Sequence, residues 1–170
     1  MNTKIEITPS GRFTVTDGEI TAFEGADSNS VYAPLVLPEN SVESIADGLF
    51  CDITVKGMMA FPHSIKRIGR HCFDGCTFDT LVLHEELTNI GDGAFAHSRA
   101  RKLVIDSCTE GGYGGQFKDM VIKKLYLPDD FNIRHEHEAM RALRDSGTVG
   151  MVYQGVCVYD DWDDYVSHHQ

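Results

Sequence analysis

The sequence predicts an α/β solenoid, in which short strands stack beside one another and the chain returns through short helical segments. Two observations support this prediction. Apolar residues recur at an interval close to 22 residues through the middle of the chain. Hydrophobic residues make up 42% of the 170 residues, which is enough for a core without disulfides or metals. Since one such unit cannot bury its own apolar side, neighbouring units must stack into a continuous core.

The repeat is clearest in two neighbouring segments. "FPHSIKRIGRHCFDGCTF" aligns with "LHEELTNIGDGAFAHSRA", and an earlier copy, "LPENSVESIADGLFCDI", aligns after one extra residue is allowed. A strand position recurs with gaps of 24, 22, 22 and 22 residues, at Leu37, Phe61, Leu83, Ile105 and Leu127. A phenylalanine position recurs beside it, at Phe50, Phe73, Phe95 and Phe117. "DSCTEGGYGGQFKDMVIKKLYLP" is therefore a degenerate fourth repeat, which keeps the phenylalanine and loses the Ile-Gly pair.

These columns indicate a short leucine-rich-repeat array of about 4–5 repeats. They resemble the BspA-type leucine-rich repeat, whose units read roughly L-x-x-I-x-I-P-x-x-V-x-x-I-G-x-x-A-F-x-x-C. The resemblance lies in "LVLPENSVESIADGLF", "AFPHSIKRIGRHCFDGC", "LVLHEELTNIGDGAFAHS" and "LYLP", within residues 31–128. It implies a right-handed solenoid with a strand ladder on one face, and binding of a protein or ligand rather than catalysis. It implies no catalytic residues.

The Gly-x-Gly of "LTNIGDGAFAHS" has a structural explanation in this repeat. Gly91 occupies the same place as Gly69 and Ala46, directly after an isoleucine that we expect to be buried. A small residue there permits a tight turn or a close approach of two backbones. A phosphate-binding loop would follow a longer strand and carry further glycines or a Lys-Ser/Thr pair, and none follows here.

We expect a single leucine-rich-repeat domain over residues 1–170. Residues 1–30 form a β-rich N-terminal cap, with strands "KIEIT", "RFTVT" and "ITAFE" and a hairpin turn at Asp17-Gly18. The repeats occupy residues 31–128. Residues 129–170 form a helix-strand C-terminal cap and an acidic tail: "DDFNIRHEHEAMRALRDSG" predicts a helix, "VGMVYQGVCV" a terminal strand, and "YDDWDDYVSHHQ" a partly mobile segment.

One row of the strand ladder is a candidate partner-binding surface. If alternate side chains face outward, the exposed row is apolar and contains Val36, Ala60, Val82, Val104 and Tyr126. Lys102 and Lys124 lie in the row beside it. Two alternatives remain open: the valines simply suit β-structure, or the C-terminal cap or tail covers them.

The acidic tail is a second candidate partner-binding surface. The net charge is −11 overall, +3 over residues 99–128 and −6 over residues 129–170. The candidate residues of the tail are Asp160, Asp161, Trp162, Asp163 and Asp164, with the tryptophan as an aromatic anchor. The leading hypothesis is a non-catalytic protein–protein interaction module. The alternative is a small acidic intracellular inhibitor that occupies a basic or nucleic-acid-binding surface of a target protein.

Several other classes of function lack support in the sequence. "HEHE" at residues 135–138 does not have the spacing of a zinc protease, and we expect no catalytic residue, metal or cofactor. The acidic balance argues against direct nucleic-acid binding. An odd count of five cysteines and an N-terminus without a signal peptide or membrane span predict reduced thiols in the cytoplasm. Homo-oligomer formation stays open.

Overall fold

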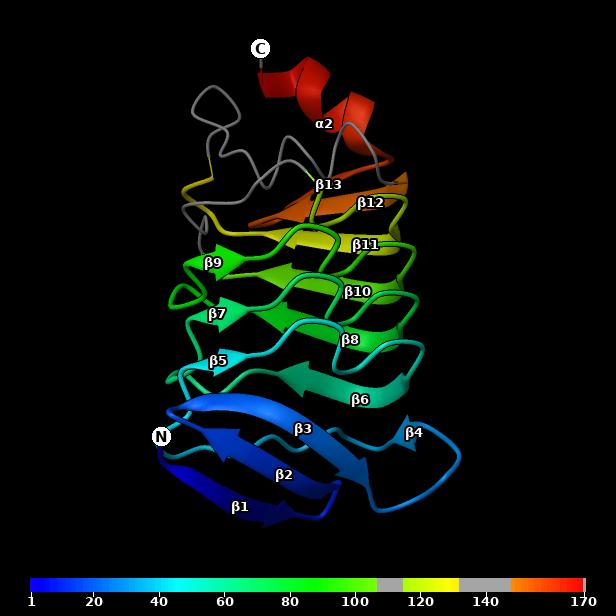
Figure 1. Ribbon diagram of the computed structural model, residues 1–170. Coiled ribbons are helices and arrows are strands. Elements are labelled where there is room, and N and C mark those ends of the chain that lie inside the picture. The colour runs from blue at the N-terminus through cyan, green and yellow to red at the C-terminus, as the bar shows by residue number, and fades with distance from the viewer. Residues whose placement is uncertain (107–114, 132–147, 170) are drawn as a thin grey trace.

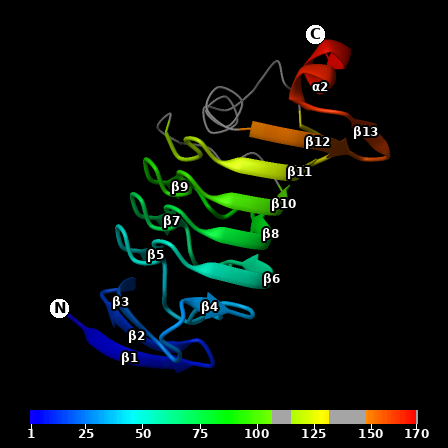
Figure 2. The same cartoon turned by 90° about the vertical axis from the view of Figure 1, so that its right-hand side faces the viewer.

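The computed structural model describes residues 1–106, 115–131 and 148–169, which form a β-solenoid of about five turns. Two sheets enclose the core (Figures 1 and 2). The seven-stranded sheet, here called the ladder sheet, has the order β13 (Cys157–Tyr159), β12 (Thr148–Gln154), β11 (Val121–Leu127), β10 (Arg99–Ile105), β8 (Thr77–Leu83), β6 (Thr54–Ala60) and β4 (Val31–Tyr32). The six-stranded second sheet has the order β1 (Thr3–Thr8), β2 (Gly11–Thr16), β3 (Glu19–Gly25), β5 (Ser44–Ile45), β7 (Arg67–Ile68) and β9 (Asn89–Ile90).

Each turn of the solenoid follows the repeat that the sequence predicts. A ladder strand ends, the chain crosses to a two-residue strand of the second sheet, and a turn that carries the phenylalanine leads back. The four phenylalanine rings stack along the axis with centroid distances of 5.1, 5.5 and 5.7 Å, and each is at most 1% exposed. This confirms the leucine-rich-repeat solenoid. The returns that the structure describes are turns and short strands, however, and not the short helices we expected.

The glycines of the repeat are explained by close packing of successive turns. A Cβ atom added at Gly91 would lie 2.7 Å from the backbone nitrogen of Arg70. The equivalent atom at Gly69 would lie 2.5 Å from the backbone nitrogen of Asp47. Backbone atoms cannot move aside as a flexible side chain can, so only glycine fits at these two positions. The structural interpretation of "IGDG" is therefore supported by geometry.

The N-terminal cap is the β-rich unit that the sequence predicts. Strands β1, β2 and β3 are antiparallel, and Asp17 and Gly18 form the turn between β2 and β3 with φ of 49° and 84°. Two positive φ values are typical of a type I′ hairpin turn. Strand β3 then pairs in parallel with β5, which joins the cap to the repeats.

The C-terminal cap differs in part from the prediction. The expected terminal strand is present as β12, but the chain turns back after it to form the antiparallel strand β13. The last segment, expected to be partly mobile, is helix α2 (Trp162–His169). Its Trp162 and Tyr165 are 6% and 0% exposed, because they close the end of the core. The helix predicted within residues 129–147 lies mainly outside the described residues. No described helix has the length and apolarity to cross a membrane.

Candidate interaction surface

The register of the ladder sheet places an apolar row on its outer face. Leu81 and Leu83 of β8 point into the core, so Val82 between them faces outward and is partly exposed. Strand pairing aligns the same position of the neighbouring strands. The resulting apolar row consists of Ala60, Val82, Val104, Tyr126 and Tyr153. The outward orientation of Val82, Val104 and Tyr126, predicted from alternation, is thus observed.

Val36 is partly exposed between the buried Leu35 and Leu37, as the alternation predicts, but it lies in no described strand and does not continue the paired row. Its backbone nitrogen donates a hydrogen bond to Ser10 Oγ at 2.7 Å, and its carbonyl accepts one from Thr8 Oγ1 at 2.8 Å. The N-terminal hairpin therefore holds this segment, which lies outside every strand. Strand β4, earlier in the chain, pairs only with Thr54 and Val55 at the start of β6. The sequence pattern around Leu35 and Leu37 does not indicate that the N-terminal hairpin binds the backbone of this segment.

Two tyrosines extend the row towards the C-terminal end. The rings of Tyr126 and Tyr153 stack with their centroids 4.5 Å apart and their planes at 10°. Lys124 Nζ lies 5.8 Å from the centroid of the Tyr153 ring, within the range of a cation–π contact. Tyr153 was not predicted from the repeat, because it follows Tyr126 after an irregular gap of 27 residues. The recurrence of a tyrosine directly after an apolar residue in "LYL" and "VYQ" was the available signal.

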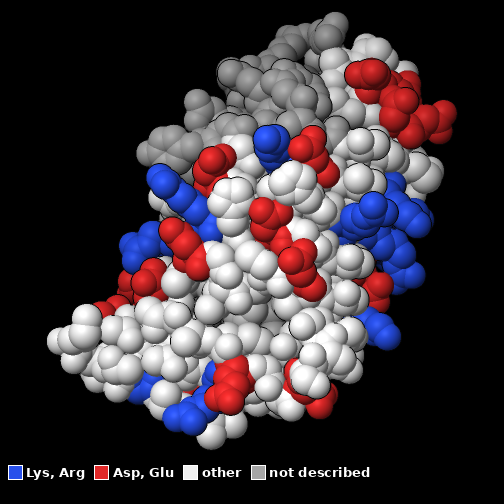
Figure 3. Space-filling view, turned by 45° about the vertical axis from the view of Figure 1, so that its right-hand side comes forward, with Lys and Arg blue, Asp and Glu red and all other residues white. Residues whose placement is uncertain are grey.

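A basic patch lies beside the apolar row on β10 and β11. It consists of Arg99, Arg101, Lys102, Lys123 and Lys124. Figure 3 shows Lys and Arg side chains gathered along the right edge of the molecule. Lys102 and Lys124 are direct partners in the parallel pairing. Among the described residues, no carboxylate forms an ion pair with any of the five. Asp79 on β8 faces the same way, but its carboxylate accepts a hydrogen bond from Gly57 N.

The acidic end of the molecule is formed by Asp160, Asp161, Asp163 and Asp164 at the start of α2. Two of these residues also stabilise the helix: Asp161 Oδ1 accepts a hydrogen bond from Asp164 N at 2.8 Å, as an N-cap does. Asp160 and Asp163 are exposed. The predicted aromatic anchor, Trp162, is buried in the core, so its side chain does not face a partner. Figure 3 shows acidic residues above the basic surface on the same side of the molecule.

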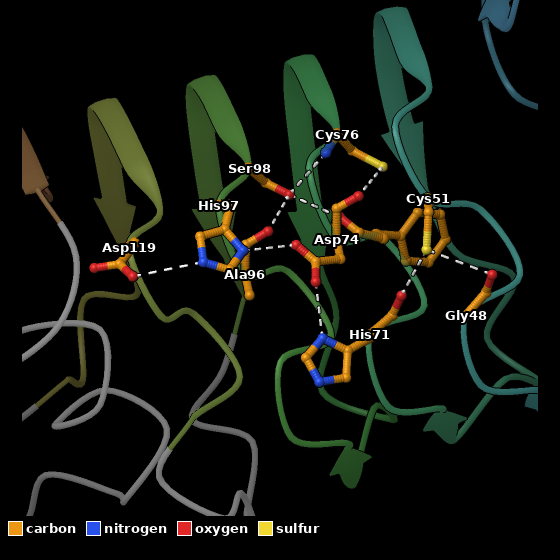
Figure 4. Close-up of polar contacts among 10 residues, drawn as sticks. Gly48, Cys51, His71, Asp74, Cys76, Ala96, His97, Ser98 and Asp119 are labelled. Atoms are coloured by element: carbon orange, nitrogen blue, oxygen red, sulfur yellow. Dashed lines mark hydrogen bonds and ion pairs between the residues drawn. The ribbon is translucent and has the colours of Figure 1, made fainter.

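A chain of histidines and aspartates follows the turns between the sheets (Figure 4). His71 Nδ1 lies 2.8 Å from one carboxylate oxygen of Asp74, and His97 Nδ1 lies 2.9 Å from the other. His97 Nε2 lies 3.6 Å from Asp119. Partial burial opposes ionisation of Asp74, but the hydrogen bonds from His97 and His71 outweigh it and lower the pKa. This chain of side chains was not predicted from the sequence, because His71 and His97 occupy different columns of the repeat.

The described cysteines show no sign of an activated thiol. Cys72 and Cys76 are buried, and burial raises the pKa of both, that of Cys76 to about 12. Cys51 is exposed, yet partial burial and the nearby Asp74 also raise its pKa. A nucleophilic cysteine needs a lowered pKa, so these environments disfavour covalent catalysis. Among the described residues, no group of three or more histidines, cysteines and carboxylates could hold a metal ion.

A polar groove crosses the short strands of the second sheet, on the side opposite the ladder face. It encloses about 320 Å³ above Gly69 and Gly91 and is bordered by Arg67, Asp47 and Asp92 among other residues. The close packing of successive turns at the glycines leaves this depression. Its walls mix both charges, so the groove does not favour one kind of ligand.

The comparison with protein families agrees with this architecture. A model described as the BspA type leucine rich repeat region matches residues 20–137 in six copies. The chain belongs to the BspA-type leucine-rich repeat family. The match begins at β3, the strand of the N-terminal cap that continues the second sheet of this BspA-type array. Comparisons with curated proteins and with solved structures found no match. Membership in this family suggests a protein-interaction module. The family is also typically non-catalytic.

Proposed function

We propose that the chain is a non-catalytic protein-interaction module that binds a partner protein through the outer face of the ladder sheet. One observation carries the proposal: an apolar row lies beside a basic patch that forms no ion pair with any carboxylate of the described residues. The apolar row supplies area that a partner can remove from water. The basic patch supplies charge that selects and orients the partner.

The pairing of Lys102 with Lys124 supports a binding role. Neighbouring strands lie about 4.8 Å apart, and like charges directly opposite each other in a sheet are destabilising. The adjacent Lys123 and the two arginines of β10 add to the same positive field. An acidic surface that covers the basic patch converts this repulsion into attraction, which gives the arrangement a function in a complex.

The tyrosine pair supplies an anchor next to these charges. Tyr126 and Tyr153 are partly exposed, and their stacking fixes both rings. Tyrosine is enriched in the energetically dominant parts of interfaces, since it buries a large apolar ring and keeps a polar hydroxyl. A rigid pair loses little conformational entropy when a partner covers it.

The experiment is affinity capture with the wild-type chain and with Val82→Arg/Val104→Arg, followed by mass spectrometry. The control is Thr88→Arg/Asn89→Arg, which adds the same charge at exposed positions on the second-sheet side. Circular dichroism checks that all three chains fold. The proposal predicts a protein retained by the wild type and the control and lost by the double valine variant. Equal retention by all three chains contradicts it.

The acidic-inhibitor alternative assigns binding to the acidic end instead. The exposed Asp160 and Asp163 are the residues that would contact a basic target. This alternative predicts that Asp160→Lys/Asp163→Lys loses the captured protein while Val82→Arg/Val104→Arg keeps it. It also predicts loss of binding at high salt, since exposed charge pairs are screened and apolar contacts are not.

A further inference from the structure

We propose that a second copy of this chain docks on the ladder face to form a twofold dimer. In this dimer the basic patch of each copy faces the acidic end of the other. The inference rests on the proposed function, because it uses the same face and names its partner. Three features carry it: complementary charge, exposed apolar residues between the charges, and a rigid acidic end.

The charges of one molecule match those of a second molecule turned over. The basic patch carries five cations, and the acidic end carries four aspartates. Both lie on the same side of the solenoid, one beyond the other along its axis (Figure 3). A twofold axis between them therefore brings each basic patch onto the opposite acidic end. Such an interface is isologous, so the two contacts are equivalent and the assembly closes at two copies.

The region between the two charged clusters is apolar. Tyr153 and Met151 lie on β12 and Val158 on β13, between the basic strands and α2, and Tyr126 of β11 stacks on Tyr153 at the edge of the basic patch. Met151 and Val158 are 37% and 52% exposed. Near a twofold axis each of these side chains meets its own copy or a close neighbour. The surface thus has the apolar centre and charged rim that stable interfaces share.

The area is also appropriate for a dimer. Strand spacing, strand length and helix diameter give a face of about 29 by 23 Å from β8 to α2. This corresponds to about 670 Å² in projection, close to the roughly 800 Å² that each partner buries in an interface of standard size.

The acidic end cannot neutralise the basic patch of its own molecule. Trp162 and Tyr165 fix α2 in the core, and the Tyr165 hydroxyl donates a hydrogen bond to Gln154 Oε1 at 3.0 Å. The four aspartates therefore stay beyond β13 while the cations stay on β10 and β11. An unrelated acidic protein would cover only the cations, whereas a second copy covers both clusters.

The test is sedimentation equilibrium of two variants with reversed charges, alone and mixed. Lys102→Glu/Lys124→Glu lowers the charge of the basic patch from +5 to +1, and Asp160→Lys/Asp163→Lys brings the acidic end from −4 to 0, so each variant weakens both contacts of its own dimer. We expect each variant alone to dimerise more weakly than the wild type. An equimolar mixture should dimerise more strongly than either variant alone, because one contact of the heterodimer then joins an unchanged basic patch to an unchanged acidic end. Misfolded chains could not complement each other in this way.

Lys66→Glu/Arg67→Glu is the matched control, with the same change of charge on the second-sheet side. It should dimerise as the wild type does. Raising the salt from about 0.05 to about 0.5 M NaCl should weaken the wild-type dimer about tenfold or more, because the charged rim is screened.

Three results would overturn the dimer: a monomeric wild type at about 100 µM in low salt, charge-reversed variants that dimerise as well as the wild type, or a mixture that dimerises no more strongly than either variant alone. Different results would contradict the proposed function, so failure of the dimer and failure of the interaction module can be told apart. If the wild type is monomeric but captures a protein that Val82→Arg/Val104→Arg loses, the interaction module stands and the dimer is refuted. If the wild type dimerises through charges but the valine variant keeps its captured protein, the dimer stands and the proposed interaction module is refuted.

Discussion

Replacement of Gly91 by alanine tests whether the Gly-x-Gly segment is part of the scaffold. The new Cβ would lie 2.7 Å from Arg70 N, 2.8 Å from Gly69 C and 3.0 Å from Arg70 Cα. Ordinary contacts of a Cβ atom begin at 3.4 Å, so all three backbone atoms are too close. The chain can relieve this overlap only by moving the turns apart, which stretches the 2.8 Å hydrogen bond from Gly91 N to Ile68 O.

The magnitude follows from two opposing effects. Overpacking of this kind costs about 1–3 kcal/mol, while alanine in place of glycine reduces the entropy of the unfolded chain and returns about 0.4–1 kcal/mol. The net loss of unfolding free energy is about 1 kcal/mol, which lowers Tm by roughly 2–4 °C in a chain of this size. Asn89→Ala is the control, because this exposed residue precedes the same turn and its replacement should shift Tm by about 1 °C or less.

Differential scanning calorimetry of the three chains, with and without inorganic phosphate, provides the assay. The scaffold interpretation predicts a lower Tm for Gly91→Ala and no effect of phosphate on any of the chains. An unchanged Tm for Gly91→Ala, together with stabilisation of the wild type alone by phosphate, would refute the scaffold interpretation and indicate that the segment is a phosphate-binding loop.

Three further predictions concern the core, the histidine chain and the thiols. Phe95→Ala removes a fully buried ring stacked at 5.5 and 5.7 Å on its neighbours, so unfolding free energy measured with urea should fall by about 3–5 kcal/mol. Hydrogen bonds from two histidines lower the folded-state pKa of Asp74, so its stabilising effect is full above the unfolded pKa and disappears as pH falls through the folded pKa. Asp74→Asn should therefore lower the urea midpoint at about pH 7 and have less effect at about pH 3, and an equal effect at both values would contradict this. In a Cys108→Ser chain, two thiols should react readily with Ellman's reagent, and Cys72 and Cys76 only after denaturation. Four readily reactive thiols in the native chain would show that the buried pair is accessible.

The fold was predictable because its physical cause is repeated. Phe50, Phe73 and Phe95 occupy the same environment in successive turns, so their spacing reports the geometry of stacking directly. The alternation around Val82 was equally informative, since a ladder strand has one buried face and one exposed face. These features depend on local sequence and on identical neighbours.

The remaining features depend on contacts between segments that do not repeat. Val36 has the right neighbours for the apolar row, but Ser10 and Thr8 of the N-terminal hairpin bind its backbone. Trp162 lies in an acidic segment typical of a solvated tail, and only the open end of the core explains its burial. Tyr153 joins the apolar row after an irregular connection, so no period could place it.

The most direct test of the proposed binding face is a lysine-reactivity footprint of the wild-type chain. Acetylation of each lysine is measured by mass spectrometry, for the chain alone and in complex with the protein it captures. Binding through the ladder face predicts that Lys102 and Lys124 become protected in the complex while Lys66, on the second-sheet side, keeps its reactivity. Unchanged reactivity of Lys102 and Lys124 in a stable complex would contradict the account and place the binding surface elsewhere.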